Sequence, residues 1–260
     1  MEEKKNDPAK IVLLVLTICA VIAVVFGTLF HIIGWGFRLG KNLGFDGKGL
    51  GDMIEKEETL DSFKNINVDA DLINLTIETG DGYSYKYRGP EKLLPRISVD
   101  GDKLLIKQRD KKIKNLKDAK VNEDLKLILT VPEGAKFKTG DVTVDLGNLD
   151  MKDISFDKLS IVADLGNVEG NNIRADKLNI NADLGNVEIH DLTFTDLEVD
   201  ADLGNVEIES AEDVSGYEIS VETDMGSVTV FGEDVKHEYQ RDGSGGSIDI
   251  DADMGNVEIR

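Results

Sequence analysis

The sequence has only one cysteine and three histidines, the residues from which disulfide frameworks and many active sites are built. Cysteine occurs once, as Cys19, so no disulfide can form within the chain, and disulfides say nothing about its compartment. No Ser-His-Asp, Cys-His or metal-binding histidine grouping is apparent, and phosphate-binding loops and Gly-x-Ser-x-Gly patterns are missing. We therefore predict that the chain is not an enzyme and that it has no catalytic, cofactor-binding or metal-binding residues.

Basic residues are scarce in the second half of the chain. Residues 141–260 hold 30 Asp and Glu against 7 Lys and Arg, a balance of −23, whereas residues 53–140 hold 16 against 17, a balance of +1. The net charge of −21 therefore comes from the second half. A strongly negative surface repels nucleic acid and anionic lipid headgroups. It would attract cations, cationic peptides or the basic surface of a partner protein.

One six-residue stretch recurs through that acidic half. The glycines Gly147, Gly166, Gly185 and Gly204 are each 19 residues apart, and Gly226 and Gly255 follow after 22 and 29 residues. The copies are Val144–Leu149, Ala163–Val168, Ala182–Val187, Ala201–Val206, Thr223–Val228 and Ala252–Val257. A fixed period near twenty residues indicates one structural unit that stacks on its neighbours, which is a solenoid.

Each unit has the alternation of β-strands. Apolar and polar residues alternate along Leu178–Ile189, so Leu178, Ile180, Ala182, Val187 and Ile189 should all point inward. A tight corner at the glycine needs the positive φ that Gly185 adopts without a Cβ clash. Aromatic residues make up only 6% of the sequence, so the filling must be aliphatic. We predict an all-β chain with a single-stranded parallel β-solenoid, right-handed by preference, over residues 141–260.

Residues 53–140 are strand-rich but not cleanly repetitive. Val68–Ile77 aligns with Val199–Ile208 as a first copy in which Ile73 replaces the glycine, and Asp100-Gly101 marks a hairpin. We predict that this region is a β-rich cap on the N-terminal end of the stack. At the other end, 232–246 is predicted to be a loop, and the last coil ends at Ile259-Arg260 with no cap after it. Such an open strand edge would be a liability or a docking site.

A membrane segment precedes these strands. Residues 11–33 contain no charged side chain over 23 residues, which suffices for a helix to cross a bilayer of about 30 Å. We predict a tail over residues 1–10, this transmembrane helix, and a linker over residues 34–52 that is rich in glycine. Lys and Arg counts on the two sides tie, so orientation stays open. A cytoplasmic tail is preferred, with the acidic domain extracytoplasmic.

The acidic residue before each Leu-Gly or Met-Gly step forms a predicted column. Stacked coils would place its members about 4.8 Å apart. Either each carboxylate bonds its own turn and points to solvent, or Ca²⁺ binds between coils through oxygen ligands. The Gly-Gly-x-Gly-x-Asp calcium pattern is absent, which favours the solvated reading. The column consists of Asp145, Asp164, Asp183, Asp202, Asp224 and Asp253.

A family resemblance accompanies these patterns. Val131-Pro-Glu-Gly134, Gly140-Asp-Val-Thr-Val144 and the repeated Asp-Leu-Gly-Asn-Val copies resemble a bacterial family of β-strand repeat domains of unknown function, often labelled "putative adhesin". The resemblance covers about 60–260. Some members look like membrane-anchored proteins of the Lia-type cell-envelope stress system, which implies an envelope location, a binding or sensing role, and no catalytic residues.

Two functions remain open at this point. The first is a non-enzymatic binding or sensing module of the cell envelope, whose acidic solenoid contacts cationic peptides, envelope components or a partner protein. The second is a structural protein that self-associates through its exposed C-terminal coil. The uneven charge favours the first, and the open terminal strand favours the second.

Overall fold

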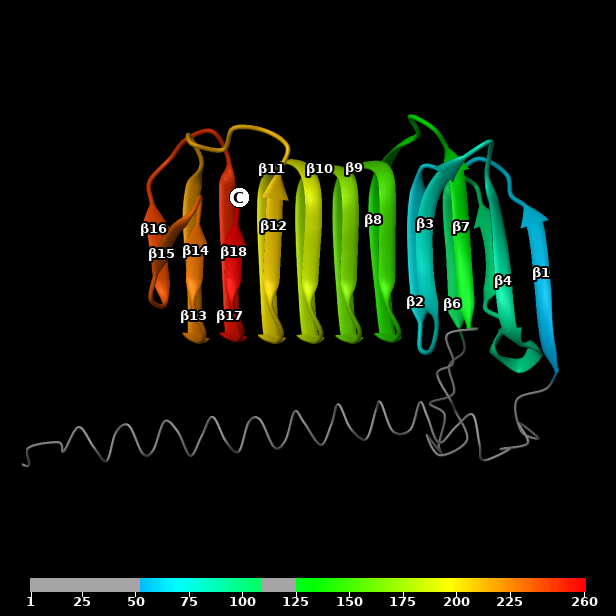
Figure 1. The fold of residues 1–260 in the computed structure, drawn as a ribbon. Coiled ribbons are helices and arrows are strands. Elements are labelled where there is room, and N and C mark those ends of the chain that lie inside the picture. The colour runs from blue at the N-terminus through cyan, green and yellow to red at the C-terminus, as the bar shows by residue number, and fades with distance from the viewer. Residues whose placement is uncertain (1–51, 109–124) are drawn as a thin grey trace, which may run out of the picture. The chain divides into compact units, whose positions relative to one another are not determined.

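The computed structural model describes residues 52–108 and 125–260, and within these residues the regular structure is strand apart from one short 3₁₀ helix (Figure 1). The helix is η1 (Glu91–Leu93). The strands are β1 (Met53–Thr59), β2 (Asn65–Ala70), β3 (Asn74–Gly80), β4 (Ser84–Pro90), β5 (Arg96–Asp100), β6 (Lys103–Gln108), β7 (Lys126–Pro132), β8 (Lys136–Leu146), β9 (Leu149–Leu165), β10 (Val168–Leu184), β11 (Val187–Leu203), β12 (Val206–Ser210), β13 (Glu218–Met225), β14 (Val228–Val230), β15 (Glu233–Val235), β16 (Glu238–Arg241), β17 (Ser247–Met254) and β18 (Val257–Ile259).

The chain divides into two compact units, Met1–Lys48 and Gly49–Arg260. The first unit lies outside the described residues, and so does the transmembrane helix predicted for residues 11–33. Residues 109–124 also lie outside the described residues. Among the residues that are described, no helix has the length and apolar character needed to cross a membrane.

The 19-residue units stack as parallel coils. Strands β8, β9, β10 and β11 pair in parallel, and each register joins residues 19 apart, such as Leu178 with Leu197. The inward side chains predicted from the alternation are all buried, Ile180 completely. Along β10 two adjacent exposed residues interrupt the alternation at 171–172 and again at 176–177. The strand bends at these two breaks, so the segments of one coil surround its aliphatic core from three sides. The predicted solenoid-like architecture is confirmed, and its hand stays a prediction.

The glycine corners fix how closely the coils approach. A Cβ on Gly185 would lie 1.9 Å from the carbonyl oxygen of Gly166, and every other corner glycine meets the neighbouring coil at 1.7 to 2.0 Å. Gly185 also has φ of 151°, in the region that glycine favours. Beside every corner glycine except Gly226, an asparagine side chain accepts a hydrogen bond from a backbone N–H of the neighbouring coil, as Asn167 does from Asn186 at 3.0 Å. At these six corners there is therefore no room for a Cβ, and the asparagine ladder ties successive coils together.

The C-terminal coil does not lie at the end of the stack, and this corrects the prediction. Strand β17 pairs in parallel with both β11 and β13, and β18 pairs with both β12 and β14. Figure 1 shows β18, in red, between β12 and β14. The corner glycines follow the same order, because Gly255 lies against Gly204, and Gly226 lies against Gly255. The last coil in sequence is thus inserted between two earlier ones. The C-terminal coil has no exposed strand edge, so the hypothesis of self-association through such an edge is not supported.

The region predicted to be a loop at 232–246 forms the cap that the sequence analysis missed. Strand β16 pairs antiparallel with β13, and β15 pairs antiparallel with β14. These two short strands satisfy the outer backbone groups of the terminal coil, which would otherwise form an open edge. Their side chains are mostly exposed or half-buried.

The N-terminal end is closed in the same way, as predicted. Strand β2 pairs in parallel with β8 and β6, and β3 pairs in parallel with β9 and β7. Antiparallel strands follow outside: β5 on β6 at the Asp100-Gly101 hairpin, β4 on β7, and β1 on β4. The first copy of the repeat is therefore a true coil. Parallel coils occupy the middle of the unit, and antiparallel strands protect both ends.

Candidate binding face

The six predicted aspartates do form a column at the corner of the stack. Each lies between residues that pair across coils, such as Ala182 with Ala201 and Leu184 with Leu203. The insertion of the last coil changes their order to Asp145, Asp164, Asp183, Asp202, Asp253 and Asp224. Carboxylates about 4.8 Å apart repel by about 0.9 kcal/mol in water. The column therefore accumulates negative charge that the solvent and its ions must screen.

A broader acidic surface adjoins the C-terminal part of this column. Three neighbouring coil segments, 196–202, 247–253 and 218–224, contain ten Asp and Glu and no Lys or Arg. Parallel pairing places them side by side, because Asp200 pairs with Asp251 and Asp251 pairs with Glu222. We call their outward carboxylates the acidic face: Asp196, Glu198, Asp200, Asp202, Glu218, Glu222, Asp224, Asp249, Asp251 and Asp253.

The crowding on this face changes the acidity of its central carboxyl. Burial raises the pKa of Asp251, and the nearby charges of Asp200, Asp253, Asp224 and Asp249 raise it further. The shift runs in the direction expected when like charges share one surface. In the described residues no Lys or Arg forms an ion pair with Asp200, Asp249 or Asp251. A cation bound to this face would therefore reduce the electrostatic repulsion among its carboxylates.

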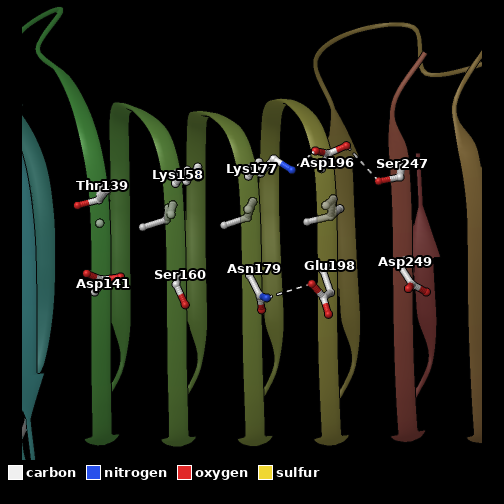
Figure 2. Close-up of a pocket in the computed structure, with 14 residues that line it drawn as sticks. Thr139, Asp141, Lys158, Ser160, Lys177, Asn179, Asp196, Glu198, Ser247 and Asp249 are labelled. Carbon is white, nitrogen blue, oxygen red and sulfur yellow. Dashed lines mark hydrogen bonds and ion pairs between the residues drawn. The ribbon is translucent and has the colours of Figure 1, made fainter. Parts of the chain in front are cut away.

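A shallow groove of about 690 Å³ crosses the coils beside the acidic face (Figure 2). Its charged side chains change in sign along the groove, since Asp141 lies on the earliest coil, Lys158 and Lys177 on the next two, and Asp196 and Asp249 on the later ones. Lys177 and Asp196 meet at 2.9 Å, and this contact raises the pKa of the lysine and lowers that of the aspartate. The middle of the groove, which carries the two lysines, is thus partly neutralised, whereas its later end continues into the acidic face.

Another side of the stack carries a second column of carboxylates, but its charge is compensated within the fold. Asp150, Glu169, Glu188, Glu207 and Glu258 lie on successive coils. Lys152 contacts Asp150 at 3.1 Å, and Arg260 contacts Glu207 at 2.8 Å and Glu258 at 2.6 Å. This contrast distinguishes the acidic face, because its acids have few such partners.

His190 also belongs to the compensated side, and both of its ring nitrogens have carboxylate partners. Its Nε2 lies 2.8 Å from Glu188 and its Nδ1 lies 2.9 Å from Glu209. The hydrogen bonds with Glu188 and Glu209 raise the pKa of His190. His237 is exposed. His31 and Cys19 lie outside the described residues.

A metal site at the aspartate column finds no support in the geometry. Within residues 52–108 and 125–260, no three His, Cys, Asp or Glu side chains converge as a ligand set. The adjacent asparagine oxygens, which could have served as ligands, accept backbone hydrogen bonds instead. Both interpretations of the aspartate column, solvated carboxylates and Ca²⁺ between coils, stay predictions.

Comparisons with known proteins agree with the fold. Residues 63–260 match the family model described as Toastrack DUF4097. No curated protein matches the chain. A crystal structure of a "putative cell adhesion protein" from Clostridium sporogenes is similar, with a TM-score of 0.50 and 14% identity, over 80% of this chain and 99% of that one.

A second solved structure is a "putative adhesin" from Bacteroides fragilis, with a TM-score of 0.46 and 15% identity, over 80% of this chain and 97% of that one. These two neighbours are described as a putative cell adhesion protein and a putative adhesin. The resemblance predicted from the repeats is confirmed.

Proposed function

This chain belongs to the Toastrack DUF4097 family, and we propose that it is a membrane-anchored, extracytoplasmic binding or sensing module of the bacterial cell envelope. It is proposed to have no enzymatic activity and to bind a cationic partner, either a peptide or a basic surface of an envelope component. The adhesin descriptions of its structural neighbours support a binding role. Electrostatic attraction would raise the rate and the salt sensitivity of association.

The single observation that carries this proposal is the difference between the two charged sides. Carboxylates of the compensated side have Lys152, His190 and Arg260 as partners. The acidic face concentrates ten carboxylates with no Lys or Arg in the same segments. Self-repulsion of this kind costs stability, so a partner that neutralises the face would be bound with favourable electrostatic energy.

The experiment uses residues 49–260, which form a compact unit of their own. Binding of a 16-residue oligolysine is measured by titration calorimetry at increasing ionic strength. The acidic-face variant is Asp200→Asn, Asp249→Asn and Asp251→Asn together. The control variant removes the same charge from exposed positions near the N-terminal end: Glu57→Gln, Asp61→Asn and Asp81→Asn.

The acidic-face variant should lose at least about tenfold in affinity and part of the salt dependence, whereas the control should stay within about twofold. Equal losses in the two variants would mean that total charge, and not this face, attracts the peptide. Absence of binding at low salt would overturn the proposal.

The envelope location rests on the uncharged run of residues 11–33. An external protease added to intact protoplasts should digest the acidic domain and leave only a short fragment that contains the N-terminal segment. Full protection of the domain until the membrane is opened would contradict the proposed orientation.

A further inference from the structure

One corner of the stack carries a row of apolar side chains that point out of the core. The leucine or methionine before each corner glycine pairs with its equivalent in the next coil, as Leu165 pairs with Leu184 and Leu203 with Met254. We call this row the leucine edge, and its members in spatial order are Leu146, Leu165, Leu184, Leu203, Met254 and Met225.

The leucine edge is accessible along its length. Leu165, Leu184 and Met225 are 44%, 41% and 51% exposed, and the other three members are half-buried. Six side chains about 4.8 Å apart form a row about 24 Å long. Single exposed leucines are ordinary, but a contiguous apolar surface on a soluble domain often marks a contact site.

The fold itself shows how one position of this row is covered. Leu72 occupies the equivalent position in the first coil, yet it is only 1% exposed. The Gln108 side chain accepts a hydrogen bond from the Leu72 N–H at 2.8 Å and donates to the carbonyl oxygens of Leu72 and Leu93. Leu93, at the end of η1, is itself buried. At this position of the row the chain therefore supplies its own cover, and the Gln108 side chain lies against the Leu72 backbone.

The two flanks of the leucine edge differ in charge. On one side runs the aspartate column, and its members Asp183, Asp202, Asp224 and Asp253 are exposed. On the other side runs the asparagine ladder, whose side-chain oxygens already accept backbone hydrogen bonds, as that of Asn186 does from Asn205 at 3.0 Å. A partner would thus find an apolar row with negative charge along one flank and a neutral, satisfied flank opposite.

We propose that the leucine edge is the docking site for an amphipathic helix whose apolar stripe is bordered by Lys or Arg. The charge complementarity in this inference rests on the function proposed above. A helix rises 1.5 Å per residue, so about 16 residues span the 24 Å row. Side chains at i, i+3, i+4 and i+7 would lie on the leucines, and the basic residues would face the aspartates.

The test compares three 16-residue peptides on residues 49–260. The first contains leucine and lysine in amphipathic helical order, the second has the same composition scrambled so that no apolar face forms, and the third is oligolysine. The edge variant is Leu165→Ser, Leu184→Ser and Leu203→Ser. The control is Met53→Ser, which removes a 54% exposed side chain on β1, away from the edge. Circular dichroism follows helix formation on binding.

The amphipathic peptide should bind at least about tenfold more tightly than the scrambled one and become helical. That advantage should disappear in the edge variant and persist in Met53→Ser. If oligolysine binds but the amphipathic order adds nothing, the leucine edge is wrong while the acidic face stands. If only the amphipathic peptide binds, the acidic face fails and the edge stands. Concentration-dependent self-association of residues 49–260 that the edge variant abolishes would also overturn the inference, because a second copy would then be the occupant.

Discussion

The side-chain oxygen of Asn205 accepts a hydrogen bond from the backbone N–H of Asn256 at 2.9 Å, although 51 residues separate the two in sequence. Asn256 in turn accepts from Ser227, which lies earlier in the chain than Asn256 does. This order places the final coil inside the stack. It also explains why the fifth copy in sequence has Ser227 where the others have asparagine, since no further corner follows it and needs an acceptor.

The position of the inserted coil determines which pairs of residues lie close enough to be joined by an engineered disulfide. Glu198 pairs with Asp249, and Asp249 pairs with Ser220, so Glu198 and Ser220 lie two strands apart. In residues 49–260, which contain no native cysteine, Glu198→Cys with Asp249→Cys should oxidise readily, because neighbouring strands bring Cα atoms within about 7 Å. Glu198→Cys with Ser220→Cys should stay reduced. If the coils stacked in chain order, Glu198→Cys with Ser220→Cys would oxidise instead. Mobility on a non-reducing gel distinguishes the two outcomes.

Substitution at a corner glycine should be severe. The Cβ of Gly185→Ala would lie 1.9 Å from the carbonyl oxygen of the preceding coil, at a φ of 151°. We expect a loss of more than about 3 kcal/mol in the free energy of unfolding, measured by urea denaturation. Gly82→Ala is the matched control, since nothing lies within 4 Å of its added Cβ. Its effect should stay within about 0.5 kcal/mol. Similar losses in the two variants would contradict the close stacking of coils.

Much of the fold follows from the local pattern of the repeat. The alternation at Leu178–Ile189 identifies the buried side chains, and the 19-residue spacing identifies which residues stack. The sequence also contains the pattern of a second corner. Asp153, Asn172 and Asp191 recur at the same 19-residue spacing and adopt positive φ of 53° to 56°. Aspartate and asparagine tolerate that conformation better than other side chains with a Cβ.

The order of the coils could not be read from the same pattern. The segments Ser247–Met254 and Glu218–Met225 both have the register needed to pair with β11, so local alternation does not decide which one does. The choice depends on the path of the connection and on the antiparallel pairing of β15 and β16, which are long-range features. Two residues of the fifth copy, Ser227 and Thr223, were weak signals of this order of coils. The Thr223 hydroxyl donates a hydrogen bond to the Gly255 carbonyl oxygen at 3.1 Å.

Stability should depend on pH through the acidic face. Because the folded-state pKa of Asp251 is raised, the folded state retains its proton at a pH where the unfolded chain, with a pKa near 3.8, has released it. Stability therefore falls as pH rises through that window and remains lower at neutral pH. Asp251→Asn should raise the thermal midpoint at pH 7 and lose this advantage below pH 3.8. Glu57→Gln, on exposed β1, is the control. An equal effect of both variants would reject crowding of carboxylates as the cause.

The compensated side should also lose stability as pH rises, but in a higher pH window. The raised pKa of His190 means that its contacts with Glu188 and Glu209 stabilise the fold fully below its unfolded pKa of 6.5. That contribution is lost as pH rises through the folded pKa, and for a partly exposed pair it is below about 1 kcal/mol. His190→Gln should flatten this part of the stability profile between pH 6 and 9, and His237→Gln should leave it intact. An unchanged profile in His190→Gln would show that the pairs contribute nothing.

The candidate face was only partly predictable from sequence. The column from Asp145 to Asp253 follows from one repeat position, and the structure brings its members together. The denser surface depends on Glu198-x-Asp200-x-Asp202 lying beside Asp249-x-Asp251-x-Asp253, which requires the inserted coil. The pairing of His190 with two glutamates needed the register of β11 with β12 as well. Composition located the charge, but topology decided where it is concentrated.

Carboxyl footprinting tests the central claim most directly. Residues 49–260 are labelled with a carbodiimide and an amine, with and without bound oligolysine, and the modified carboxylates are quantified by mass spectrometry. We predict strong protection of Asp200, Asp249 and Asp251 and no protection of Glu57, Asp61 or Asp81 near the other end of the stack. Uniform protection of both groups, or protection of neither, would contradict a cation-binding role for the acidic face.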